Sequence, residues 1–173
     1  MSGDRLIVDG YNVLYLHPVY GAMAREDLDA ARARLVADLA GLAQGGPHMT
    51  VVFDGGGNPY SDGTPHHIGS LSVIFSPTGT TADTVIEGLA QRSRERGERA
   101  TVITSDSATR LTVRSGTVSV LSSEHFLEDV VGDVAARAEV SRTARRRTHM
   151  AERLAPDVRT VLARWARGEA PRG

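Results

Sequence analysis

The sequence predicts an α/β fold in which a mostly parallel sheet of about five strands is covered by helices on both faces. Short, nearly continuous apolar runs alternate with segments of helical periodicity, which is typical of this class. Acidic residues follow several of the predicted strands. Because the carboxyl ends of parallel strands meet at one edge of a sheet, candidate functional groups gather there.

Five β-rich runs are the predicted strands. The first four are apolar almost throughout, as expected for strands that are buried on both faces. The fifth alternates polar and apolar residues, which favours an edge position. The runs are Arg5–Val8, Thr50–Phe53, Leu71–Phe75, Ala100–Thr104 and Thr117–Leu121.

Helical periodicity fills the gaps between these runs. Apolar residues at spacings of three and four predict a helix over residues 28–42, and Thr81–Arg96 predicts a second one that ends at Gly97. A short helix is expected after Asp106, and another from about Ser123 to Arg137. Strands that alternate with helices in this way indicate a parallel sheet.

Two segments interrupt this alternation. Residues 55–70 are rich in Gly and Pro and predict a surface loop, in which the adjacent His66 and His67 are expected to be ordinary loop residues. The C-terminal segment has an apolar stripe at helical spacing, which predicts an amphipathic helix that packs on the body or on a second copy of the chain. The stripe comprises Met150, Leu154, Val158, Val161, Leu162 and Trp165.

Composition limits the classes of protein. All 20 basic residues are Arg, and the absence of Cys excludes disulfides and thiolate metal sites. Residues 1–136 carry 10 Arg against 17 acids, a balance of −7, whereas residues 137–173 carry 10 Arg against 4 acids, a balance of +6. No secretion signal is recognised, and no apolar run approaches the roughly 20 residues of a membrane span. We therefore expect a cytoplasmic protein with no membrane partner.

Four aspartates are expected at the carboxyl edge of the sheet. Asp9, Asp54 and Asp106 each follow a predicted strand, and Asp83 lies in the first turn of the helix that follows the third strand. Each has a simpler interpretation as a turn or helix-cap residue. Four aspartates at one edge would destabilise the folded state, because two carboxylates about 4 Å apart repel by about 4 kcal/mol at an effective dielectric constant near 20. A divalent cation would neutralise them.

Carboxylate ligands favour Mg²⁺ or Mn²⁺, which prefer hard oxygen donors. Such an ion with open coordination positions suits phosphodiester hydrolysis. Asn12 lies about one helical turn beyond Asp9, where its side chain could hydrogen-bond a phosphate of the substrate or a water. This pattern therefore predicts a metal-dependent phosphodiesterase site.

The motifs "IVDGYNVL", "VVFDG", "TGTTADTVIE" and "VITSD" resemble, in this order, the YacP-like branch of the NYN domains within the PIN-like nuclease superfamily. The resemblance extends over about residues 4–130. It implies a Rossmann-like three-layer α/β/α sandwich with strand one near the centre, and RNA cleavage that depends on Mg²⁺ or Mn²⁺. Residues 1–136 would form the nuclease domain and residues 137–173 an Arg-rich helical extension.

Carried over position by position, the resemblance implies a metal site formed by Asp9, Asp54, Asp83 and Asp106. Asn12 and Ser105 would support catalysis and substrate binding. Some members of this branch are associated with ribosomes and messenger RNA decay, so single-stranded RNA or mRNA and the ribosome are the implied partners.

The extension lies outside the motifs that carry this resemblance. Arg145, Arg146 and Arg147 are the most basic part of it, and we expect them to contact the phosphate backbone of RNA without reading its sequence.

Two other functions are consistent with parts of the sequence. A non-catalytic module that binds RNA or the ribosome would use the Arg-rich helix, but it would have no use for four mutually repelling acids. A haloacid-dehalogenase-type phosphatase would use Asp9 as its nucleophile. Such an enzyme needs a second aspartate two residues later, and Tyr11 stands at that position.

Overall fold

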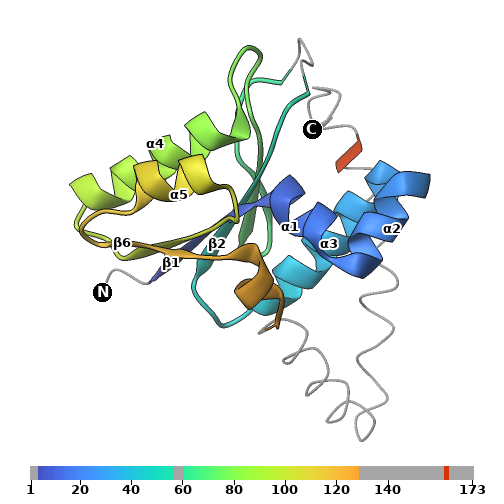
Figure 1. Ribbon diagram of the computed structural model, residues 1–173, viewed down its shortest axis with the longest axis horizontal. Helices are drawn as coiled ribbons and strands as arrows, with labels where there is room; N and C mark the ends of the chain where they lie inside the picture. The colour runs from blue at the N-terminus through green and yellow to red at the C-terminus, as the bar shows by residue number, and fades with distance from the viewer. Residues whose placement is uncertain (1–3, 57–60, 129–161, 164–173) are drawn as a thin grey trace, which may run out of the picture.

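The computed structural model describes residues 4–56, 61–128 and 162–163, and it shows a sheet with helices on both faces (Figure 1). The predicted fold class is therefore confirmed. The elements in chain order are β1 (Arg5–Asp9), α1 (Gly10–Leu16), α2 (Pro18–Glu26), α3 (Leu28–Ala43), β2 (His48–Phe53), β3 (His66–Ile68), β4 (Leu71–Phe75), α4 (Ala82–Glu95), β5 (Ala100–Ile103), α5 (Ser107–Val113) and β6 (Val118–Leu121).

The sheet has six strands in the order β3-β4-β2-β1-β5-β6. Strand β1 lies between β2 and β5 and is parallel to both, so its last residue, Asp9, lies beside Val52 near the centre of one edge. Strand β6 is at the edge of the sheet, as its alternating sequence predicts. All neighbouring pairs are parallel except β3 and β4, so the carboxyl ends of five strands meet at one edge.

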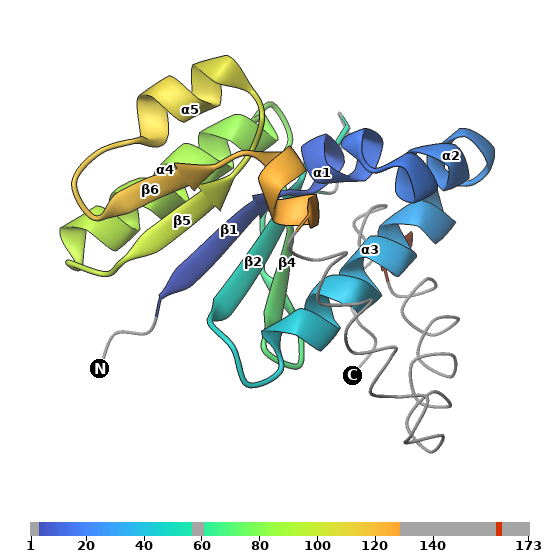
Figure 2. The same cartoon turned by 60° about the horizontal axis from the view of Figure 1, so that its bottom comes forward.

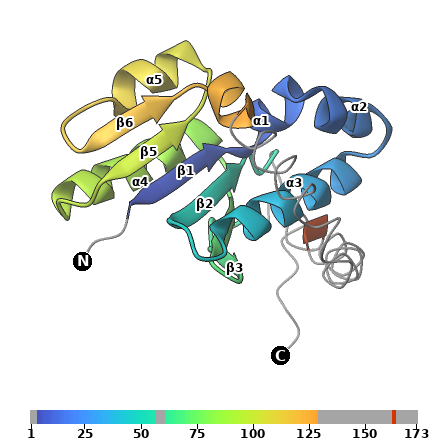
Figure 3. The ribbon, with the colours of Figure 1, turned by 90° about the horizontal axis from the view of Figure 1, so that it is seen from below.

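Alternate residues of the strands face two separate cores. Val8 packs with Leu35 and Leu39 of α3 on one face of the sheet. Its neighbour Ile7 packs with Ile86 and Ala90 of α4 on the other face. Figures 2 and 3 show α3 on one side of the strands and α4 with α5 on the opposite side. The three-layer arrangement follows from this division.

The loop predicted over residues 55–70 is partly wrong, because it contains strand β3. Ile68 pairs with Leu71, so Gly69 and Ser70 form a two-residue hairpin loop in which Gly69 has a φ of +58°. A two-residue loop that begins with glycine is typical of β-hairpins, since glycine adopts positive φ at little cost. His66 and His67 are therefore strand residues.

Two short helices between β1 and α3 were not predicted. Helix α1 begins directly after Asp9, and α2 begins at Pro18 after a cap formed by His17, whose Nδ1 accepts from the N–H of Val19 at 3.2 Å. The predicted helices α3 and α4 are confirmed, and the chain leaves α4 through Gly97, which has a φ of +65°. None of the helices in the described part of the chain combines the length and apolarity needed to cross a membrane.

The C-terminal prediction is tested at two places only. Residues 123–128 are helical, which agrees with the start of the helix expected over Ser123–Arg137. Leu162 is 1 % exposed and joins the core that contains α3, so this position of the apolar stripe packs on the body of the protein. The rest of the extension, including Arg145–Arg147, lies outside the described residues.

The junction between β1 and α1 makes a prediction about stability. A Cβ atom at Gly10 would lie 2.5 Å from a ring carbon of Phe53, which is fully buried, so Gly10→Ala should lower the free energy of unfolding by about 1–3 kcal/mol. Gly41→Ala is the matched control, because a Cβ there meets nothing within 4 Å and alanine favours the helix. Chemical denaturation of both variants measures the difference. Equal stabilities would contradict the close packing at Gly10.

Candidate active site

Asp9, at the carboxyl edge of the sheet, is the most buried acidic residue in the described part of the chain. It is 9 % exposed and caps the N-terminus of α1, where its Oδ1 accepts from the backbone N–H of Asn12 at 3.2 Å. Its Oδ2 accepts from the hydroxyl of Thr104 at 3.3 Å. Because Gly10 leaves room for the ring of Phe53, the chain passes directly from the strand into the helix at this point.

The surroundings of Asp9 disfavour its charge. The pKa of Asp9 is raised from 3.8 to about 6. Burial is the largest cause, and the nearby carboxylates of Asp83 and Asp106 contribute to the same increase. The N–H of Asn12 and the hydroxyl of Thr104 act in the opposite direction. Asp9 therefore lies within electrostatic reach of two of the three other predicted site acids.

Thr109 connects those two acids. Asp106 caps α5, and its Oδ2 accepts from the backbone N–H of Thr109 at 2.7 Å, which lowers the pKa of Asp106. The hydroxyl of the same threonine donates to Oδ1 of Asp83 at 2.8 Å. Thr109 is 2 % exposed and was not predicted as a site residue. Its position three residues after an N-cap aspartate is the only sequence signal that marks it.

Asn12 joins α1 to the loop after β5. Its Oδ1 accepts from the N–H of Ser105 at 2.9 Å and from the hydroxyl of Ser123 at 2.6 Å. The hydroxyl of Ser105 in turn accepts from the N–H of Ser123 at 3.0 Å and donates to Glu124. Since the amide oxygen of Asn12 is used inside the protein, its NH₂ group is the part that can donate to a substrate oxygen.

Asp54 faces α4 more than it faces Asp9. Its Oδ1 accepts from the N–H of Gly56 at 2.8 Å, and its Oδ2 accepts from the N–H of Ala82 at 3.3 Å. Ala82 directly precedes Asp83, so Asp54 holds the start of the helix that carries the third acid. The structure thus places Asp83 and Asp106 within electrostatic reach of Asp9, whereas the hydrogen bonds of Asp54 go to its own loop and to α4.

The chemistry of these donors fits a hard divalent cation. Among residues 4–56, 61–128 and 162–163, no three Asp, Glu or His side chains are already arranged as a set of metal ligands. The groups around Asp9 are nevertheless oxygen donors, the kind that Mg²⁺ and Mn²⁺ prefer. Burial is the main cause of the raised pKa of Asp9, and the negative charges of Asp83 and Asp106 add to it, so a bound cation would stabilise the ionised carboxylate.

Three aromatic side chains pack together close to the end of β1. The ring of Tyr11 stacks on that of Tyr15 with centroids 5.8 Å apart and meets the ring of Phe53 edge-on at 5.2 Å. Tyr11 is therefore partly a packing residue.

Comparison with known families identifies the class of protein. The YacP-like NYN domain matches residues 6–167, which is nearly the whole chain. The chain belongs to the YacP-like NYN family. This family is part of the PIN-like nuclease superfamily, so its function is of the nuclease type and related to RNA. The match continues beyond residue 130, where the resemblance of the motifs ends, and therefore includes the Arg-rich segment.

Solved structures show the same fold. Rae1 (YacP) from Bacillus subtilis is 24% identical over 96% of this chain and 96% of its own, with a TM-score of 0.65. A tryptophan-to-leucine mutant of the same protein is 24% identical over 84% of this chain and 85% of its own, with a TM-score of 0.66. No curated protein matches the chain. These likenesses establish the fold of the YacP-like NYN family for this chain.

The burial of Asp9 predicts a dependence of stability on pH. Raising a carboxyl pKa from 3.8 to about 6 corresponds to about 3 kcal/mol, by which the ionised carboxylate destabilises the folded state above pH 6. As the pH falls from about 6 towards 3.8, the folded state binds the proton first and this destabilisation disappears. Asp9→Asn keeps a good N-cap and should therefore melt higher than the wild type at pH 8, but not at pH 4.

Melting curves in EDTA at both pH values measure this effect. Asp4→Asn is the control, because Asp4 lies at the opposite end of β1 and its side chain is 61 % exposed. Its stability should stay within about 0.5 kcal/mol of the wild type at both pH values. If Asp9→Asn melted lower than the wild type at pH 8, the charge of Asp9 would be stabilising and the description above would be wrong.

Proposed function

We propose that this protein is a metal-dependent endoribonuclease whose site lies at the carboxyl edge of the sheet. The observation that carries the proposal is that Asp83 and Asp106, which both bond Thr109, lie within electrostatic reach of the buried Asp9, in a chain of the YacP-like NYN family. Nuclease chemistry on RNA fits this combination, because phosphodiester hydrolysis benefits from a cation held by carboxylates beside the scissile phosphate.

Each side chain of the site would have a separate role in binding the cation or the RNA. Asp9, Asp83 and Asp106 would hold Mg²⁺ or Mn²⁺, which when bound supplies a Lewis acid and an activated water. The NH₂ group of Asn12 would donate to a phosphate oxygen, since its amide oxygen is engaged with Ser105 and Ser123. Ser105 would support this orientation. Thr109 would keep Asp83 and Asp106 in place through its two hydrogen bonds.

Asp54 remains a predicted metal ligand, and its contacts suggest a positioning role as well. Its bond to the N–H of Ala82 fixes the first turn of α4 and with it the backbone of Asp83. We propose that the loss of Asp54 would act partly through Asp83.

The Arg-rich extension is proposed to supply affinity for single-stranded RNA or mRNA. Ten arginines against four acids in residues 137–173 give this segment the sign of charge that phosphates attract. Cytoplasmic mRNA decay linked to the ribosome is the setting we propose, on the strength of the family resemblance. A second copy of the chain is a further candidate partner for the apolar stripe of the extension.

Substitution of the site aspartates is predicted to abolish RNA cleavage. Asp9→Asn and Asp83→Asn should each abolish cleavage of labelled RNA in Mg²⁺ or Mn²⁺, because each removes a charge that would hold the cation. Asp4→Asn, the same substitution at the opposite edge of the sheet, should keep wild-type rates. The assay is run with metal and with EDTA, and with and without ribosomes. Wild-type rates in a folded Asp9→Asn or Asp83→Asn variant would refute the assignment of these acids.

Melting temperatures give a second readout that does not depend on activity. Millimolar Mg²⁺ or Mn²⁺ should raise the melting temperature of the wild type by mass action, and that of the two site variants less. RNA binding without cleavage under all conditions, together with no response to metal, would support the alternative of a non-catalytic RNA- or ribosome-binding module.

The extension makes a separate prediction. Replacing Arg145, Arg146 and Arg147 with Ala should weaken RNA binding about equally for all sequences and reduce its salt dependence by up to about three ions. Binding isotherms at several salt concentrations measure this slope. An unchanged slope would show that these arginines do not contact phosphates.

A further inference from the structure

A pocket lies at the end of the sheet opposite to the acids. It is formed between the C-terminal half of α4 and strands β1 and β2, and its volume is about 90 Å³. Arg5 lies at the start of β1, four residues before Asp9, so at a rise of about 3.3 Å per residue the pocket is about 13 Å from the acidic site. The residues that characterise it are Arg5, Thr50, Leu89, Arg92, Arg96 and Glu98.

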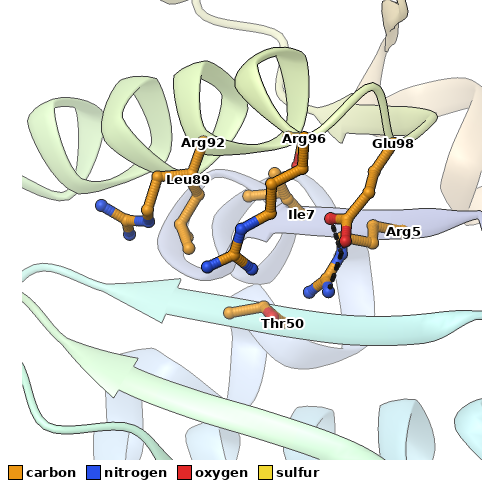
Figure 4. A pocket seen from close by; sticks show the side chains of 8 residues that line it. Arg5, Ile7, Thr50, Leu89, Arg92, Arg96 and Glu98 are labelled. Atoms are coloured by element: carbon orange, nitrogen blue, oxygen red, sulfur yellow. Dashed lines mark hydrogen bonds and ion pairs between the residues drawn. The ribbon is translucent and has the colours of Figure 1, made fainter. Parts of the chain in front are cut away.

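The pocket carries excess positive charge. Arg5 is neutralised by Glu98, with 2.6 Å between Nε and Oε2. By contrast, the guanidinium groups of Arg92 and Arg96 make no ion pair within the described part of the chain. Figure 4 shows both side chains leaving the same side of α4 and extending towards the strands, with Leu89 between them. Two uncompensated cations therefore border one small hollow.

Stabilisation of the helix accounts for only part of this arrangement. Basic residues at the end of a helix interact favourably with its dipole, and Arg92 and Arg94 lie in the last turn of α4, with Arg96 as its C-cap. Arg94 also donates to the carbonyl of Val113 at 3.3 Å and to Gln91 at 2.7 Å, so it is tied to neighbouring structure. Arg92 and Arg96 instead border the pocket.

The floor of the pocket includes one polar residue, Thr50, on a face of the sheet that is otherwise apolar. Thr50 lies beside Ile7 in register and faces the α4 side, on which Ile7, Val52 and Ile74 form the core. Across the sheet Thr50 pairs with Ser72, and Ser72 pairs with His67, whose Nδ1 is 3.1 Å from the serine hydroxyl. A row of polar side chains thus leads outward from the pocket.

We propose that this pocket binds a phosphate group, held by the guanidinium groups of Arg92 and Arg96 with the hydroxyl of Thr50 as a further donor. Guanidinium groups match the geometry of phosphate oxygens and form strong, charge-assisted hydrogen bonds with them. The volume equals that of about three water molecules, which suits one phosphate group but not a whole nucleotide. A phosphorylated small molecule and a phosphate of an RNA strand share this chemistry. Phosphate binding in this pocket does not require catalysis at the acidic edge.

Titration of the whole protein with inorganic phosphate tests the proposal. Amide NMR signals near the pocket, such as those of Thr50 and Ser93, should shift and saturate, and chloride at equal ionic strength should not produce these shifts. The double variant Arg92→Ala/Arg96→Ala should bind phosphate at least about tenfold more weakly. Thr50→Val, which keeps a β-branched side chain of similar shape, should bind with intermediate strength.

The matched control removes two arginines elsewhere. Arg25→Ala/Arg114→Ala causes the same change in net charge at two exposed positions outside the pocket and should bind phosphate like the wild type. Melting curves confirm that each variant is folded. The absence of saturable binding in the wild type, or equal binding by the wild type and the pocket variant, would overturn the proposal.

Two further arms distinguish the sources of the phosphate. Both use the same variants, one with a nucleoside 5′-monophosphate and the other with a short single-stranded RNA. If the pocket variant loses more RNA affinity than the control variant, the pocket binds a phosphate of the RNA strand. If only inorganic phosphate and the monophosphate lose affinity, the pocket serves a small phosphorylated ligand. Both results require that the loss of Arg92 and Arg96 weakens the binding of inorganic phosphate.

Discussion

Asp9 is held at the end of the central strand with only 9 % of the residue exposed, and its neighbours are arranged around this constraint. An ionised carboxylate loses hydration on burial, so it needs hydrogen-bond donors, a proton or a cation. The N–H of Asn12 and the hydroxyl of Thr104 supply two donors, one to each oxygen of the carboxylate. Helix α1 begins where it does because Asp9 caps it, and Gly10 is there because Phe53 packs against the same junction.

The sequence was sufficient for those parts of the fold that are buried on both sides. Strands β1, β2, β4 and β5 are nearly continuous apolar runs, since helices cover both faces of the sheet there. Strand β3 has no such run. The only sequence feature that indicates its hairpin with β4 is the Gly69-Ser70 loop, which lies in a segment that is rich in Gly and Pro throughout. Helices α1 and α2 were missed because they expose apolar residues: Tyr15 is 60 % exposed and Val19 57 %, which obscures an amphipathic pattern.

The acids of the candidate site could be proposed from the sequence because topology alone brings strand ends together. Their hydrogen-bond partners could not. Thr104 reaches Asp9 across 95 positions of the chain, and Thr109 reaches Asp83 across 26. Hydroxyl residues of this kind are common, and only their three-dimensional contacts distinguish them. The direction of Asp54 towards Ala82 is likewise a property of the folded loop.

Leu162 has a consequence for the order in which this protein can fold during its synthesis. Its side chain, 1 % exposed, completes a core that also contains Val8 from the first strand. Polypeptides emerge at about 5–20 residues per second, so the N-terminal strands and α3 wait for many seconds with part of their apolar surface uncovered. Leu162 can join this core only after residue 162 has emerged. Translation speed and chaperone access over that interval therefore bear on the yield of native protein.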